Sequence, residues 1–226
     1  MPARKGLRPR FVVIPTNGRA CLKDCLKAIQ PQVDSVILVY TSPYVEGELR
    51  VPVGQGIVLR DLRKPPNISR WWNQGLHTAR LVMDQVAGPR EYDVAVINDD
   101  VIVPPGWFDA VSEGMRAEGA VAGCSGGQYA NALTQRAPGP VNLAHRMQGF
   151  AYILAGEAGV RANEDLRWYF SDDYVDWAAR EKGGMTMVPR FDVQHLYPNA
   201  QMTPELHQIC GEDAAKFLSL WGRMPW

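Results

Sequence analysis

The sequence predicts an α/β fold in which helices flank a β-sheet, and its patterning and its length support this prediction. Short runs rich in β-branched residues, which are typical of buried strands, alternate with segments whose apolar residues recur at helical spacing. The chain has 226 residues, of which 46% are hydrophobic. That is enough for one sizeable core, or for one core with a small lobe.

The expected strands are short apolar runs that end at turn-forming or polar residues. We expect the first at 11–14, ended by Pro15, and others at 35–40, 56–59, 94–97 and 148–154. The segment 123–140 is rich in Gly, Ala, Gln and Asn and predicts a short strand followed by a long loop.

The expected helices follow from apolar residues at positions i, i+3, i+4 and i+7. They span about 22–29 and 69–86, begin at Trp107, run from a capping Ser171 to about Lys182, and begin again at 203–205. Within the second of them, Trp71 and Trp72 fit a place in the core better than a ligand platform.

The charges and the cysteines argue against several classes of protein. Lys plus Arg and Asp plus Glu number 24 each, so the net charge shows no overall bias toward nucleic acid or anionic membranes. Basic residues gather only at Arg4, Lys5, Arg8 and Arg10, and we expect residues 1–9 to form a flexible basic segment. No apolar run resembles a signal peptide or a membrane span, and the four cysteines lack metal-binding spacing, which predicts a cytoplasmic protein with reduced thiols.

Two adjacent acids, Asp99 and Asp100, follow Asn98 at the end of the expected strand 94–97. Two neighbouring carboxylates repel each other and are costly to desolvate unless a cation or hydrogen-bond donors lie beside them. A turn or a helix cap would explain one acid but does not require two. The pair therefore favours a site for a hard divalent ion such as Mg²⁺ or Mn²⁺.

Three other clusters could carry chemistry. The loop 15–19 follows the first strand, where nucleotides bind in such sheets, but an ordinary turn explains it equally well. Asp172 and Asp173 follow Ser171 at an expected helix start, where acids serve either capping or catalysis. His195 fits a structural role unless the fold brings it beside Asp100.

The order of these clusters resembles that of the family 2 inverting glycosyltransferases of the GT-A fold, over about residues 10–196. The matching segments are the strand and nucleotide loop 12–19, the Asn…Asn-x-Gly segment 67–75, the DxD-like segment 97–107, the glycine-containing segment 148–150, the acidic helix start 170–173 with Arg180 and Gly183, and His195.

The resemblance implies a GT-A fold, which is a single Rossmann-like mixed β-sheet flanked by helices with a small acceptor-side portion. It implies one glycosyltransferase domain over 10–226. Residues of about 10–106 would form the nucleotide-sugar half, and those of about 107–226 the acceptor half with the C-terminal helix.

The resemblance also implies an activity, a cofactor and a set of site residues. A sugar would pass from a nucleoside diphosphate, with a UDP-sugar as the favoured donor, to an acceptor hydroxyl with inversion. Asp100 and His195 would hold Mn²⁺ or Mg²⁺, and Asp173 would be the catalytic base, with Asp172 as the alternative. The residues near the nucleotide-sugar would be Pro15, Thr16, Asn17, Arg19, Thr41, Asn67, Arg70, Asn73, Asn98, Asp99 and Gly149.

The sequence departs from the family pattern at three places. Thr41 lies where many relatives carry an acid that holds the base or ribose. Asn98 replaces the first acid of DxD. Trp72 replaces the arginine that usually precedes Asn73, and Arg70 is the nearest residue that could assist the diphosphate instead.

The acceptor remains open among a glycan, a protein, a small molecule and a hydroxylated base of phage-type DNA. The basic N-terminus is compatible with DNA, whereas the neutral net charge argues against tight binding to it. Two other functions fit the same residues: a non-catalytic module that binds a nucleotide or a glycan, and a nucleotidyltransferase, which would release pyrophosphate. The sequence indicates no oligomeric state.

Overall fold

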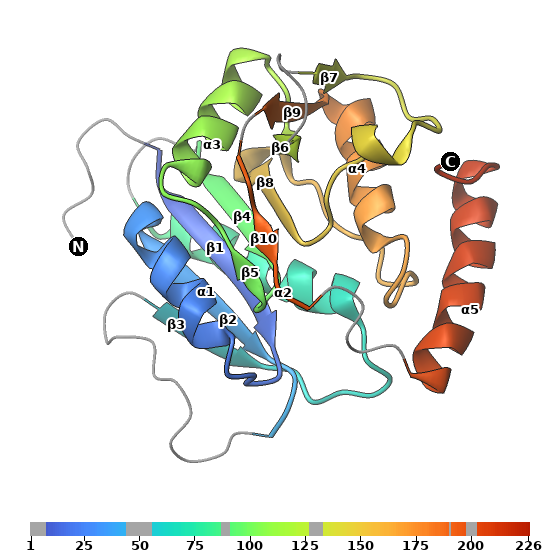
Figure 1. Cartoon of the computed structure of the whole chain (residues 1–226), viewed down its shortest axis with the longest axis horizontal. Helices are drawn as coiled ribbons and strands as arrows, with labels where there is room; N and C mark the ends of the chain where they lie inside the picture. Colours follow the sequence, from blue (N-terminus) through green and yellow to red (C-terminus); the bar gives the residue numbers. More distant parts are fainter. Residues whose placement is uncertain (1–7, 44–55, 87–90, 127–132, 190, 198–202) are drawn as a thin grey trace.

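The computed structural model describes residues 8–43, 56–86, 91–126, 133–189, 191–197 and 203–226. It has one eight-stranded mixed sheet with helices on both faces (Figure 1). This confirms the predicted α/β class with a single mixed sheet. The expected division between a flexible segment 1–9 and a domain 10–226 stays a prediction, because residues 1–7 lie outside the described part.

The sheet has a parallel half and a mixed half, in the order β3-β2-β1-β4-β8-β6-β9-β7. The parallel half is β1 (Arg10–Thr16), β2 (Ser35–Tyr40), β3 (Gly56–Arg60) and β4 (Asp93–Ile97). The other half is β6 (Ala122–Gly126), β7 (Leu133–Gln135), β8 (Ala151–Ala155) and β9 (Met185–Pro189). Strand β1 pairs in parallel with β2 and β4, whereas β8 runs antiparallel to β4 with Ala151 opposite Ile97.

A small two-stranded sheet joins two distant parts of the chain. Strand β5 (Val101–Ile102) pairs antiparallel with β10 (Gln194–His195), and His195 lies opposite Val101. The N–H of Leu196 also donates to the carbonyl of Asp100 at 2.9 Å. Because β5 directly follows Asp99 and Asp100, this pairing places His195 beside them.

The helices cover the two faces of the sheet in pairs. Helices α1 (Leu22–Ile29) and α3 (Trp107–Ala117) bury their apolar stripes on one face. Helices α2 (Ile68–Asp84) and α4 (Ser171–Lys182) pack on the other. Helix α5 (Pro204–Trp221) lies beside α4, where Phe217 packs on Trp177 (Figure 1). Three short 3₁₀ helices are η1 (Gln30–Gln32), η2 (Leu143–His145) and η3 (Gly156–Ala158).

Some elements differ from those that the sequence predicts. Strand β1 continues through Pro15 to Thr16, because β4 pairs with β1 only as far as Val13 and the missing N–H of Pro15 costs no ladder hydrogen bond there. Strand β8 begins at Ala151 rather than at 148, since the preceding residues form a turn. The expected long loop over 123–140 contains β7, and β9 has no counterpart among the expected strands.

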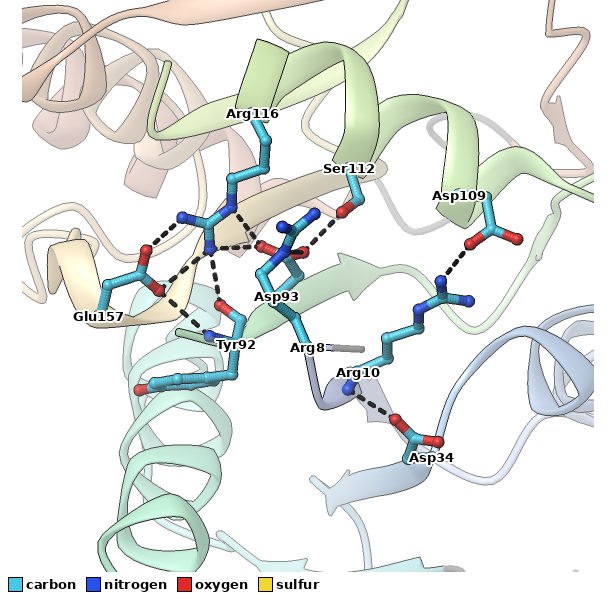
Figure 2. Close-up of polar contacts among 9 residues, drawn as sticks. All are labelled: Arg8, Arg10, Asp34, Tyr92, Asp93, Asp109, Ser112, Arg116 and Glu157. Atoms are coloured by element: carbon cyan, nitrogen blue, oxygen red, sulfur yellow. Dashed lines mark hydrogen bonds and ion pairs between the residues drawn. The ribbon is translucent and has the colours of Figure 1, made fainter. Parts of the chain in front are cut away.

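Ion pairs fix the edge of the sheet where β1 and β4 begin. Asp93 is buried and accepts hydrogen bonds from Arg8 Nε at 3.1 Å, Ser112 Oγ at 2.6 Å and Arg116 Nη2 at 2.6 Å (Figure 2). Arg10 pairs with Asp109 on α3. Among the basic N-terminal residues, Arg4 and Lys5 lie outside the described part, whereas Arg8 and Arg10 are held by these carboxylates.

The four cysteines form no disulfide, as the sequence predicts. Cys21, Cys25 and Cys124 are buried, Cys210 is partly exposed, and all four are free. None of the helices in the described ranges combines the length and the apolar composition that crossing a bilayer requires.

Candidate functional site

A cavity of about 570 Å³ opens at the edge where β1, β2 and β4 end. It brings together residues from the end of β1, from the segments after β2 and β4, from the turn before β8, from α4 and from the C-terminal segment. Its lining is Pro15, Thr16, Asn17, Arg19, Thr41, Ile68, Trp71, Trp72, Asn98, Asp99, Asp100, Gly149, Phe150, Trp168, Tyr169, Phe170, Asp172, Asp173, His195, Tyr197, Cys210 and Trp226. Most of the site residues that the sequence analysis singles out therefore share one space.

The side chain of Asp99 is fully engaged within the protein. Its carboxylate accepts hydrogen bonds from Thr16 Oγ1 at 2.7 Å and from Arg19 Nε at 3.1 Å, and it also pairs with Arg19 Nη2. A carboxylate neutralised in this way has little capacity left for a metal ion. Asp99 therefore supports the loop 15–19, and the nucleotide loop and the acids form one connected unit.

The next acid, Asp100, lies against His195. Its Oδ1 is 3.3 Å from His195 Nε2, and its Oδ2 is 3.1 Å from Arg19 Nη2. The His195 ring stacks on Phe150 with 4.7 Å between ring centroids, which fixes the orientation of the imidazole. Burial alone would raise the pKa of Asp100, but His195 and Arg19 hold that pKa below its ordinary value.

The side chains of Asp100 and His195 fit a divalent cation that takes its remaining ligands from a bound substrate and from water. Asp100 Oδ1 is buried and makes no hydrogen bond of acceptable geometry to any described residue. Across the described ranges, no group of three or more His, Cys, Asp or Glu side chains converges as a complete metal centre. Mg²⁺ in phosphate-binding sites commonly takes one or two protein ligands and completes its shell with phosphate oxygens and water. Asp100 and His195 match that incomplete arrangement.

Asp172 and Asp173 occupy the first turn of α4 and line the same cavity as the loop 15–19. The expected cap by Ser171 is wrong. Phe170 takes the N-cap position with a left-handed φ of 60°, and Ser171 is already helical, with its hydroxyl 2.9 Å from Ser69 Oγ. A non-glycine residue in this conformation is strained, and such strain is concentrated at functional sites.

The electrostatics of the two acids on α4 suit proton transfer near neutral pH. Burial raises the pKa of Asp172. Burial and the neighbouring Asp172 carboxylate raise the pKa of Asp173 to about 7, against the opposing effect of Arg146, whose Nη1 is 3.0 Å from Asp173 Oδ1. A carboxyl group with such a pKa can both accept and release a proton at physiological pH.

Gly149 lies where the backbone must approach α4 closely. A Cβ atom added to Gly149 would lie 2.6 Å from Asp172 Cγ, a separation that real Cβ atoms do not show. The glycine therefore acts by leaving room for the Asp172 side chain beside the cavity, rather than by an unusual backbone angle.

Asn67 and Asn73, assigned above to the nucleotide-sugar, do not line the described cavity. Asn67 caps α2 by accepting from the N–H of Arg70 at 2.8 Å, and it donates to the carbonyl of Glu164. Asn73 exchanges two hydrogen bonds with the backbone of Ala162, at 2.9 and 3.0 Å. Both amides are used to fasten the segment before α4 to helix α2.

Arg70 likewise points away from the cavity. Its Nε donates to buried Asp61 at 2.6 Å, and Gln74 and Arg63 donate to the same carboxylate. Asp61 directly follows β3 and binds Arg70, and no sequence pattern marks this acid. The expectation that Arg70 compensates for the replaced family arginine is therefore not met.

Local sequence patterns indicate neither the aromatic character of the cavity nor the arginine that pairs with Asp173. Trp71 and Trp72 are buried as expected, yet both also line the cavity. Arg146 reaches Asp173 from the segment before β8, in a place that no local pattern marks. The aromatic lining residues beyond the two tryptophans are Phe150, Trp168, Tyr169, Phe170, Tyr197 and Trp226.

Comparison with known proteins shows the fold. No protein-family model matches the sequence, and no curated protein does. The structure of S. aureus TarS 1-349 matches with a TM-score of 0.54 at 10% identity, over 94% of this chain and 72% of that one. A longer TarS structure matches with the same TM-score, and this chain spans only 40% of it.

A third structure, TarS 1-349 in complex with UDP-GlcNAc, matches with a TM-score of 0.50 at 11% identity, over 93% of this chain and 66% of that one. At such low identity the likeness speaks for the arrangement of the backbone alone. Together with the mixed sheet and its flanking helices, these matches show that the chain has a GT-A-like fold.

Proposed function

We propose that this protein is a glycosyltransferase that moves a sugar from a nucleoside diphosphate sugar to an acceptor hydroxyl with inversion. The observation that carries the proposal is the single cavity whose lining includes both the contacting pair Asp100 and His195 and the acids Asp172 and Asp173. The GT-A-like fold shared with TarS, one of whose structures holds UDP-GlcNAc, supports a UDP-sugar as donor.

The donor end of the cavity is formed by the loop 15–19, Thr41, Asn98, Asp99 and Asp100. Asp100 and His195 would hold Mn²⁺ or Mg²⁺, which when bound would neutralise charge on the nucleoside diphosphate. Arg19 is committed to Asp99 and Asp100, so the described lining offers no uncommitted arginine or lysine for a diphosphate. That shortage supports the need for a cation.

Asp173 is the general base in this proposal. It accepts the proton of the acceptor hydroxyl while that oxygen attacks the anomeric carbon and the bond from this carbon to the phosphate oxygen breaks. One direct displacement inverts the configuration at the anomeric carbon. Asp172 is the alternative base, and its charge helps to keep the pKa of Asp173 near 7.

The test is Asp173→Asn, which should abolish transfer while the dissociation constant of the nucleotide-sugar stays near that of the wild type. Asp172→Asn, measured in parallel, identifies which acid is the base. Wild-type activity in Asp173→Asn would remove this residue from the role.

A screen of nucleotide-sugars with Mn²⁺ separates this function from the two alternatives. Slow hydrolysis that releases a nucleoside diphosphate supports a transferase. Binding without turnover across the whole panel would favour a non-catalytic module. Release of pyrophosphate from a nucleoside triphosphate offered together with a sugar phosphate would favour a nucleotidyltransferase.

A further inference from the structure

The part of the cavity next to Asp173 is walled by aromatic rings. We call this part the acceptor end and define it by Trp168, Tyr169, Phe170, Asp172, Asp173 and Trp226. Phe170 is buried, and its ring centroid lies 5.5 Å from that of Trp226. Trp226 itself is 63% exposed although it is a large apolar side chain. An open tryptophan beside a buried aromatic residue provides a flat apolar surface at the rim of the site.

Arg146 links this surface to the proposed base. Its guanidinium donates to Asp173 at 3.0 Å, and its Cζ lies 5.4 Å from the ring centroid of Trp226. A single planar group therefore touches both residues. Trp226 and Asp173 also line the same cavity, so a ligand bound at the acceptor end can contact both.

The charge at the acceptor end is unfavourable for an anionic ligand. Asp172 and Asp173 both line it, and the adjacent cation, Arg146, is already paired with Asp173. Elsewhere in the described lining, Arg19 is paired with Asp99 and Asp100. A nucleic acid carries one negative charge per nucleotide and depends on free Lys or Arg to neutralise it, which this part of the described cavity does not supply.

We propose that the acceptor is a neutral carbohydrate whose pyranose ring packs on Trp226 and presents a hydroxyl to Asp173. One face of a pyranose ring consists mostly of C–H groups, which pack on an aromatic ring, while the hydroxyls at its edge donate to carboxylates. This inference rests on the proposed function, because it names the acceptor for that transfer.

Transfer of the sugar needs no reactant other than the donor and the acceptor. The sugar hydroxyl gives its proton to Asp173, its oxygen forms the new bond to the anomeric carbon, and the nucleoside diphosphate leaves with the electron pair of the broken bond. The hydroxyl of a modified DNA base or of a protein side chain would undergo the same chemistry. The protein surface at the acceptor end therefore decides which class of acceptor binds.

The first experiment presents three acceptors to the full-length protein with Mn²⁺ and the donor that it hydrolyses. They are a set of methyl pyranosides, a DNA duplex with hydroxymethylated bases and a peptide rich in Ser and Thr. We expect transfer to at least one pyranoside. Transfer to the duplex or the peptide with none to a pyranoside would overturn the proposal.

The second experiment replaces Trp226. We expect Trp226→Ala to raise the KM for the pyranoside roughly tenfold, well beyond any change in the KM for the donor, and Trp226→Phe to restore most of the loss. Leu220→Ala is the matched control, since Leu220 is a similarly exposed apolar residue near the end of α5 that does not line the described cavity. An unchanged KM for the pyranoside in Trp226→Ala would overturn the role of this ring.

A binding measurement separates failure of this inference from failure of the proposed function. Ligand-observed NMR with the methyl pyranosides, with and without UDP and Mn²⁺, requires no turnover. Signal transfer to a pyranoside that is lost in Trp226→Ala supports the carbohydrate surface even if no donor is hydrolysed. Active transfer without any such dependence on Trp226 would leave the transferase standing and remove the inference.

Discussion

The backbone of Gly149 lies directly against the side chain of Asp172, so that a Cβ on the glycine would come within 2.6 Å of Asp172 Cγ. The two residues belong to different parts of the chain, the turn before β8 and the first turn of α4. This contact sets how deeply the acids of α4 reach into the cavity.

Gly149→Ala should therefore lower the rate of transfer at least tenfold, because the added methyl group displaces Asp172 and with it the first turn of α4. Steady-state kinetics with the best donor measures this loss. Gly211→Ala is the control, since Gly211 lies in α5 with open space where a Cβ would lie, and that change should leave the rate unchanged and slightly stabilise the helix. An equal rate in Gly149→Ala would show that the position of Asp172 is irrelevant to catalysis.

The rate of transfer should depend on the ionisation of Asp173. The base must be deprotonated, and the pKa of Asp173 is about 7, so the rate should rise with pH and level off above that value. Arg146→Gln removes the cation that stabilises the carboxylate, which should shift this rise to higher pH by roughly one unit. Arg146→Lys keeps the charge and should shift it less, as pH–rate profiles will reveal. Superimposable profiles for the wild type and Arg146→Gln would refute this coupling.

The same shift in pKa has a consequence for stability. Because burial raises the pKa of Asp173 above its ordinary value of 3.8, this group favours the folded state below that pH, and the contribution is lost as the pH rises through about 7. Asp173→Asn should accordingly raise the Tm at pH 8 and have little effect at pH 4. If the Tm of Asp173→Asn at pH 8 is below that of the wild type, the predicted direction of this effect is wrong.

Binding of the donor should depend on the cation. Asp100→Ala should abolish the stabilisation that Mn²⁺ plus a nucleotide-sugar gives in thermal shift measurements, and His195→Gln should weaken it at least tenfold in affinity. EDTA should have the effect of Asp100→Ala on the wild type. Asp24→Ala, an exposed acid on α1 outside the lining of the cavity, should behave as the wild type. Donor binding that survives both EDTA and Asp100→Ala would exclude this cation site.

The carboxylates in Figure 2 should differ sharply in their contribution to stability. Asp93 is buried among Arg8, Ser112 and Arg116, so Asp93→Ala should lower the free energy of unfolding by about 3 kcal/mol. Asp109 pairs with Arg10 with nearly half of its side chain exposed, and Asp109→Ala should cost about 0–1 kcal/mol. Urea denaturation of the two variants tests the contrast, and equal losses would refute it.

Local sequence patterns predict most of the helices and strands and most of the residues that line the cavity. The β-branched run ending at Ile97 predicts β4, and the abrupt change to Asn98 marks the edge at which the cavity opens. Patterns of this kind depend only on neighbouring residues, so they can be read without the fold. The wrong assignments, at Ser171 and Arg70, arise where each side chain bonds to a partner outside the local pattern, Ser69 and Asp61 respectively.

The sequence by itself determined the α/β class and the order of the polar clusters, because burial of alternating apolar segments leaves few other arrangements. Only the tertiary structure decided that the two strand-end acids, Asp99 and Asp100, have different partners. Asp99 meets Thr16 from 83 residues away and Asp100 meets His195 through the pairing of β5 with β10. Such contacts depend on how strands that are distant in sequence pair with one another, which no local spacing encodes.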